Sequence, residues 1–279
     1  MDYGTGIITR TLSLRSPIGP ERKLWQYHPR SSRHTAVACW CIVFDLFASN
    51  EMLQRRVASR DLGFAIGQRM RDKATGIKHP MPIVLGFGES KRGAVSFVEV
   101  GEELEIKLSE SERDLLDSLP PLRGFHVTDV VLAATSRASM TSVGKSTSRL
   151  FDSMDATRTA AHGDSPSAVL VSHLVCNVAE DCFSPLEKRM VRNPTNGVRN
   201  VLDTGRRLAA PTSSANPAFT AFGISFVNCR NQGSAKVHPI PSEVFDALDL
   251  SYARMISEAS DAVTERLRTI PSAEAVQTK

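Results

Sequence analysis

The longest apolar stretch of the chain, residues 34–47, reads HTAVACWCIVFDLF and is rich in β-branched and aromatic side chains. An apolar run of this kind predicts a buried strand, ended here by Asp45 and by Ser49-Asn50. Residues 103–108 (ELEIKL) alternate, so one face of that strand is expected to meet water. Shorter apolar runs bounded by turn residues predict further strands at 82–87, 94–100, 125–134, 168–178 and 219–229.

Helical patterns are fewer. A helix is expected at 109–119, because Ser109 is followed by Glu112 at the spacing of a capping box. Residues 51–73 are a weaker candidate, because two glycines interrupt them. The clearest helix is at 242–270, where apolar residues recur every three or four positions and arginines occupy the last turn.

These elements do not alternate regularly between helix and strand, which argues against a doubly wound parallel sheet. The pattern predicts a β-rich chain, either all-β or α+β, with an antiparallel β-sandwich or jelly-roll-like core and a C-terminal amphipathic helix. Residues 1–33 are expected to be a basic flexible arm, 34–270 one core domain, and 271–279 a loose tail.

Composition narrows the class of protein. The 279 residues contain no run of 18 apolar residues, so no transmembrane segment is expected. Five thinly spread cysteines argue against a disulfide framework and for a reducing compartment. No Cys-x2-Cys pair exists, so a zinc site is not expected. No other metal and no cofactor is predicted.

The net charge of +4 is modest, but the cations are gathered in separate segments of the chain. Such segments suit a phosphate backbone, because each neutralised phosphate releases a counterion. The alternative is that they form ordinary solvated faces. The candidate RNA-binding residues are Arg55, Arg56, Arg60, Arg69, Arg71, Lys188, Arg189, Arg192, Arg199, Arg206 and Arg207.

A possible phosphate-binding loop lies at Gly144-Lys145-Ser146, after a predicted strand. The full pattern requires a glycine where this chain has Ser139, and a Cβ there resists the tight turn around phosphates. The stretch is therefore interpreted as a polar loop whose lysine faces solvent, rather than as a nucleotide site.

An alternative function is a Mg²⁺-dependent nuclease. Glu105 and Lys107 form a Glu-x-Lys pattern on an expected strand, with Asp72 as an upstream acid. Charge pairing alone often produces this pattern on exposed strands. No Gly-x-Ser-x-Gly turn supports acyl transfer. Trp25, Tyr27 and His28 sit among basic residues, where they could stack on bases or simply dock the arm onto the domain.

The layout is similar to that of the 30K superfamily of plant-virus cell-to-cell movement proteins. The run CIVFD ends in Asp45, Gly86 follows within PIVLGFG, and a late strand precedes the terminal helix. Asp129 competes with Asp45 for the role of the family's aspartate. The resemblance spans roughly residues 35–258, and in it Asp45 and Gly86 would be structural.

The resemblance implies a binding and transport protein rather than an enzyme. It would bind single-stranded RNA without sequence preference, form a homo-oligomer, and meet host plasmodesmal components. Its expected location is the host cytoplasm and the plasmodesmata. An RNA-packaging coat or nucleocapsid protein is the close alternative.

Overall fold

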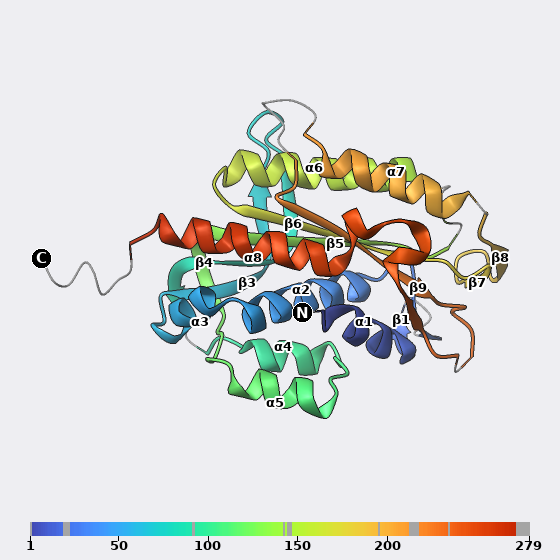
Figure 1. Ribbon diagram of the computed structural model, residues 1–279, viewed down its shortest axis with the longest axis horizontal. Helices are drawn as coiled ribbons and strands as arrows, with labels where there is room; N and C mark the ends of the chain where they lie inside the picture. The colour runs from blue at the N-terminus through green and yellow to red at the C-terminus, as the bar shows by residue number, and fades with distance from the viewer. Residues whose placement is uncertain are drawn as a thin grey trace, which may run out of the picture.

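A computed structural model describes residues 2–18, 23–90, 93–141, 143, 147–194, 196–211, 218–233 and 235–271. Its centre is a mixed six-stranded sheet with helices on both faces (Figure 1). In order across the sheet, the strands are β10 (His238–Ile240), β9 (Ala221–Asn228), β6 (Val169–Asn177), β5 (Phe125–Ser139), β4 (Lys78–Ser90) and β3 (Leu62–Arg71). The pairs β5·β6 and β6·β9 are parallel, and the other neighbours are antiparallel.

Each face of the sheet has its own apolar cluster. One face is covered by α1 (Gly4–Ser13), α2 (Arg33–Ser49) and α8 (Tyr252–Arg268), with α3 (Glu51–Ala58) beside them. The other face is covered by α6 (Thr147–Asp164) and α7 (Gly197–Ala209), the helices that connect the parallel strands. Connections of the same hand between parallel strands place both helices on the same face.

Smaller elements lie around this centre. Helices α4 (Phe97–Glu103) and α5 (Glu110–Ser118) form a lobe on the far side of α2 from the sheet (Figure 1). The remaining elements are the pair β1 (Ser16–Ile18) and β2 (Lys23–Trp25), the pair β7 (Asp181–Ser184) and β8 (Arg189–Arg192), and two 3₁₀ turns, Ser242–Phe245 and Leu248–Leu250.

The α+β alternative of the predicted fold class is confirmed, whereas a β-sandwich or jelly roll is not. The only sheets besides the central one in the described residues have two strands each. Here helices cover both faces of the central sheet, whereas in a β-sandwich a second sheet covers one face.

The strand predicted at 34–47 is wrong, because this stretch forms most of α2. Every residue from Val37 to Phe47 is buried, between the sheet, α1, α8 and the α4–α5 lobe. A helix that is apolar on all sides carries no 3.6-residue period, so its sequence resembles that of a buried strand.

The two strands expected at 94–100 and 103–108 are also wrong. The chain forms α4 here, and Ser96 and Glu99 make a capping box at its start. The same motif at Ser109 and Glu112 starts α5, as predicted. The sequence analysis did not identify the capping box of Ser96 and Glu99, because the apolar run around it has the pattern of a short strand.

Other strand predictions are confirmed. Residues 125–134, 168–178 and 219–229 match β5, β6 and β9, and 82–87 is the middle of the longer β4. The weak helix at 51–73 exists only as α3, after which the chain turns into β3.

Both ends of the chain differ from the prediction. Residues 1–33 are not a flexible arm in their described part, because α1 buries Ile7, Ile8 and Leu12 in the core. The last helix starts at Tyr252, capped by Ser251, and the segment before it is made of 3₁₀ turns. Residues 272–279 of the expected tail lie outside the described residues.

Candidate nucleic-acid interface

The short helix α3 carries two of the predicted RNA-binding arginines, Arg55 and Arg56, and a third, Arg60, follows its end. The Asn50 side chain caps its start by accepting a hydrogen bond from the Leu53 N–H at 2.9 Å. The helix ends in a left-handed residue, Arg60, at φ 61°. The Asp61 N–H then donates to the Arg56 carbonyl oxygen at 3.2 Å, which satisfies one of the last carbonyls of the helix.

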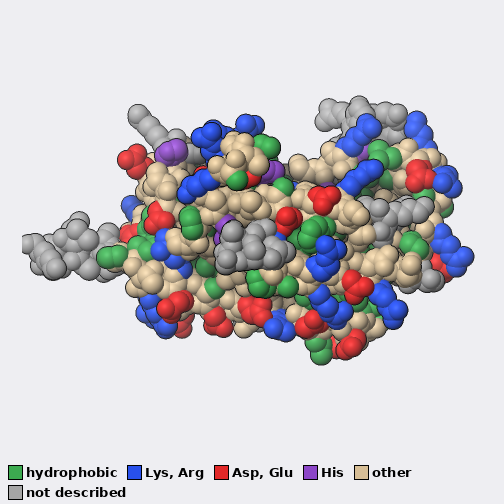
Figure 2. Space-filling view, turned by 90° about the horizontal axis from the view of Figure 1, so that it is seen from above, with side chains coloured by type: hydrophobic (Ala, Val, Ile, Leu, Met, Phe, Trp, Pro, Cys, Tyr) green, Lys and Arg blue, Asp and Glu red, His purple; other side chains and the backbone are tan. Residues whose placement is uncertain are grey.

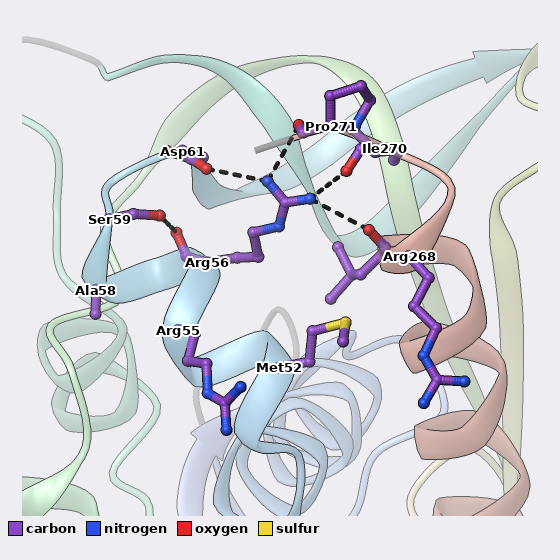
Figure 3. Close-up of a pocket in the computed structure, with 10 residues that line it drawn as sticks. Met52, Arg55, Arg56, Ala58, Ser59, Asp61, Arg268, Ile270 and Pro271 are labelled. Atoms are coloured by element: carbon purple, nitrogen blue, oxygen red, sulfur yellow. Dashed lines mark hydrogen bonds and ion pairs between the residues drawn. The ribbon is translucent and has the colours of Figure 1, made fainter. Parts of the chain in front are cut away.

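Arg56 is a structural residue rather than an RNA ligand. Its guanidinium pairs with Asp61 at 3.2 Å and donates to the carbonyl oxygens of Leu267, Ile270 and Pro271 (Figure 3). It thereby adds a donor to the Leu267 carbonyl oxygen in the last turn of α8 and supplies donors to the carbonyl oxygens of Ile270 and Pro271 just beyond it. The side chain is only 11% exposed, so little of it is available to phosphate.

A groove of about 830 Å³ lies between α3 and the end of α8. Arg55 and Arg268 line it, and Met52 lies between them (Figure 3). The side chain of Arg55 is 76% exposed and that of Arg268 is 63% exposed. Arg55 meets Glu51 at 3.0 Å and Arg268 meets Glu265 at 3.6 Å, but exposed pairs of this kind hold their cations weakly.

A second groove of about 460 Å³ lies on the other side of α3, and Ala58 lines both. Arg60 and Arg123 contribute its charges, and none of its lining residues is acidic. Together the two linings contain five arginines and one acid, Asp61, a net charge of +4. Arg123 and Arg268 were not singled out in the sequence, because each is remote from the basic segments there.

The other predicted RNA-binding residues lie elsewhere. Arg69 and Arg71 are on β3, toward the hairpin end that packs against α6. Lys188, Arg189 and Arg192 belong to the β7–β8 hairpin, which lies at the opposite end of the long axis from α3 (Figure 1). The remaining three, Arg199, Arg206 and Arg207, are on α7.

Several of these arginines already have partners. Arg189 pairs with Glu187 at 2.6 Å, and Arg206 pairs with Asp249 at 3.2 Å. Arg207 lies 4.4 Å from the centre of the Phe151 ring. On the face that carries α6 and α7, cationic and acidic side chains are interspersed rather than gathered in one patch (Figure 2). The basic segments therefore do not form one continuous surface.

Asp45 does not end a strand, contrary to the feature that supported the family resemblance. It lies within α2, fully buried, and accepts hydrogen bonds from the N–H groups of Tyr3 at 3.1 Å and Gly4 at 2.8 Å. Asp45 thus stabilises the N-terminus of α1. Burial raises the Asp45 pKa to about 6, although these hydrogen bonds act in the opposite direction.

Gly86 has a steric role in β4. The strand shifts register between Leu85 and Gly86, and a Cβ on Gly86 would lie 2.2 Å from the Asp129 carbonyl oxygen. Asp129 itself is at the surface of β5, where its side chain pairs with Arg266 at 3.0 Å.

The residues of the nuclease alternative are not assembled. Glu105 lies in the turn after α4, where it pairs with Arg33 at 3.4 Å and accepts a hydrogen bond from Ser16 at 3.0 Å. Lys107 follows in the same turn, off any strand, and Asp72 lies in the distant β3–β4 turn. Within the described residues, no three His, Cys, Asp or Glu side chains are grouped to hold a metal ion.

The phosphate-loop stretch is described only in part, and Val143, just before Gly144, is buried. β5 ends at Ser139 and α6 begins at Thr147, so a strand and a helix do flank it. Gly144, Lys145 and Ser146 lie outside the described residues.

The aromatic residues of the N-terminal segment dock onto the domain. Trp25 stacks on Phe183 with ring centres 5.2 Å apart, and Tyr27 and His28 are buried. The docking interpretation is confirmed for these side chains, and they do not form a free platform for bases.

A buried polar cluster that sequence reasoning did not identify joins three strands. His173 on β6 lies 3.0 Å (Nε2) from the Ser225 Oγ on β9 and 3.3 Å (Nδ1) from the Ser136 Oγ on β5. The Tyr252 ring meets the imidazole edge-on at 5.1 Å. The sequence indicated this cluster only through His173, a histidine within an apolar strand. A histidine in that position is more often a packed residue than a catalytic base.

This cluster resembles a nucleophile and base only superficially. Complete burial lowers the His173 pKa to about 3, so the ring is neutral and a poor proton acceptor. Among the described residues, no carboxylate accepts a hydrogen bond from the ring to orient it. The cluster therefore cross-links the sheet.

Comparison with protein-family models, curated proteins and solved structures finds no match to this chain. Among the described helices, none alone is both long and apolar enough to span a membrane. Helices α2 and α3 pass that test only as a pair, and they are bent by 95° relative to each other.

Proposed function

We propose that the protein binds single-stranded RNA without sequence preference in the two grooves that flank α3. One observation carries this proposal: the grooves meet at Ala58, and five arginines face one acid in their linings. Four of these arginines, Arg55, Arg60, Arg123 and Arg268, are exposed and make no buried ion pair with any described residue, so they can exchange solvent for phosphate.

The linings also suggest how RNA would be held. Among the described residues of the two linings, the only aromatic side chain is Phe125, which is 5% exposed and offers no surface for a base to stack on. Binding would then depend on contacts between guanidinium groups and phosphate oxygens. Such contacts position a nucleic acid but carry no sequence information.

The direct test is fluorescence anisotropy with a short labelled single-stranded RNA. The variant Arg60→Gln/Arg268→Gln removes one cation from each groove, and we expect it to bind roughly tenfold more weakly at about 50 mM salt. Arg189→Gln/Arg192→Gln is the matched control, because it removes the same charge from the β7–β8 hairpin. Equal losses in the two variants would contradict the proposal.

Transport of viral RNA between plant cells is a narrower proposal that follows from the family resemblance and requires RNA binding. A fluorescent fusion in leaf epidermis should then form puncta at the cell wall. A diffuse cytosolic signal from a fusion that still binds RNA would leave the binding proposal standing and reject transport. Regular particles containing RNA would favour a packaging protein instead.

A further inference from the structure

The α4–α5 lobe, residues 97–118, has a charge opposite to that of the rest of the chain. It contains eight acidic residues and two cations, a net charge of −6. The whole chain is +4, so all other residues together sum to +10. About a quarter of the acidic residues of the protein are therefore concentrated in this one lobe.

Most of the eight acidic side chains of the lobe are exposed and form no ion pair with a described residue. Glu112 pairs with Arg10, and Glu105 pairs with Arg33. Among the described residues, no ion pair engages the exposed side chains of Glu102, Glu103, Glu110, Asp114 and Asp117. The lobe therefore presents an anionic surface that its own molecule leaves unneutralised.

The lobe also has an apolar groove, so it is more than a cluster of acids. A groove of about 260 Å³ lies between α4 and α5, lined by Trp40, Ile106, Leu108 and other apolar residues, and its charged lining residues are two acids, Glu102 and Asp117, and one cation, Arg113. Val98, which also lines it, is 39% exposed. A surface with an apolar centre and an acidic rim suits a partner that presents cations around an apolar contact.

The lobe is a firm part of the fold. Trp40 of α2 stacks on Phe97 of α4 with ring centres 4.6 Å apart, and its Nε1–H donates to the Phe97 carbonyl oxygen at 3.0 Å. A docking partner would therefore meet a preformed surface, and little ordering entropy would oppose binding.

From these observations we infer that the α4–α5 lobe docks onto the α3 grooves of a second copy of this chain. The grooves present arginines around Met52 and Ala58, which match the acidic rim and the apolar centre of the lobe. One chain thus carries both complementary surfaces at equal concentration. The inference goes beyond RNA binding but uses the same arginines, so RNA and the lobe compete for them.

Charge reversal tests this inference in both directions. Glu102→Lys/Asp117→Lys changes the net charge of the lobe from −6 to −2 and leaves only cations among the charged residues that line its groove. Both positions lie near the C-terminal ends of their helices, where a cation suits the helix dipole. Arg60→Glu/Arg268→Glu changes the net charge of the two groove linings from +4 to 0. The expected result is that wild type grows in average mass with concentration at about 50 mM salt, while each variant alone stays monomeric.

The decisive sample is an equimolar mixture of the two variants, measured by sedimentation velocity. The intact grooves of one variant face the intact lobe of the other, so the mixture should regain the association that each variant lost. Circular dichroism and thermal unfolding establish that both variants are folded. A wild type that stays monomeric at every concentration, or a mixture that stays monomeric, would overturn the inference.

The proposal of RNA binding can be tested independently of the docking inference. The lobe variant keeps all the groove arginines, so it should bind single-stranded RNA at least as tightly as wild type. A lobe variant that no longer self-associates but binds RNA normally supports both statements. If wild type self-associates but binds no RNA, the RNA proposal fails and the docking inference stands.

Discussion

Arg55 and Arg56 are neighbours in one helix, yet they have opposite surroundings. The Arg55 side chain is 76% exposed at the edge of a groove, whereas that of Arg56 is 11% exposed and holds the end of α8. The same contrast separates two regions of the molecule. Buried polar groups such as Asp45 and His173 link elements of the core, and the exposed arginines around α3 face solvent.

The comparison teaches that burial, rather than residue type, separates the charges that hold this fold from those that can bind a ligand. A buried charge has lost its water and depends on its protein partners, so removing a partner is costly. An exposed charge keeps its water and can exchange it for phosphate. Substitutions in the first region should therefore change stability, and those in the second should change binding.

The largest expected effect is on stability, from Arg56→Ala. The change leaves Asp61 without its partner and removes the guanidinium donors from the carbonyl oxygens at the end of α8, so the free energy of unfolding should fall by about 3–5 kcal/mol. Urea denaturation measures this. Arg55→Ala is the matched control and should change stability by less than about 0.5 kcal/mol. Similar losses in both variants would abolish the contrast between the two neighbours.

The second effect is a pH dependence from His173. Its pKa is lowered to about 3, against about 6.5 in the unfolded chain, so below pH 6.5 the unfolded state binds a proton that the folded state does not. This group therefore lowers stability as pH falls, by about 1.4 kcal/mol per pH unit between 6.5 and the folded pKa.

We expect the stability difference between wild type and His173→Gln to shrink by that amount per unit as pH falls from about 6.5 to about 4. Ser225→Ala is the control, because it removes a hydrogen-bonding partner of His173 but no titrating group. Urea denaturation across this pH range is the measurement. Parallel curves for wild type and His173→Gln would show that His173 is not held neutral.

The smallest effect separates stability from binding at one residue. Arg60 has φ 61°, a conformation that costs an L-residue about 1 kcal/mol relative to glycine. Arg60→Gly should therefore raise the free energy of unfolding by about 0.5–1 kcal/mol while weakening RNA binding several-fold. Arg60→Ala loses the same charge without the relief of strain. Equal stability of the two variants would mean that the turn holds no strain.

The sequence predicted the parts of the fold that carry a clear period or cap. β5, β6 and β9 and helix α5 lie where the pattern placed them, and Ser109 and Glu112 form the expected box. The prediction failed for α2, because its burial on every side removes the polar stripe that identifies a helix. It also failed for residues 1–33, where the three buried apolar residues of α1 stand among glycine, threonine and serine and form too short a pattern to indicate a helix.

The candidate site could be predicted only in part. Arg55 and Arg60 were identified from local charge, but Arg56 was assigned to RNA although its partners come from α8 more than 200 residues away. Arg123 and Arg268 reach the grooves through tertiary packing that no local pattern records. Charge density along the chain therefore indicates which residues are cationic, not which of them share a surface.

The most direct test of the central claim is the salt dependence of single-stranded RNA binding. Four exposed groove arginines should each release about 0.7 of a counterion, which predicts a slope near −3 in a plot of log affinity against log salt. The Arg60→Gln/Arg268→Gln variant should reduce that slope to about half. A wild-type slope near zero, or one that the variant leaves unchanged, would contradict RNA binding through the α3 grooves.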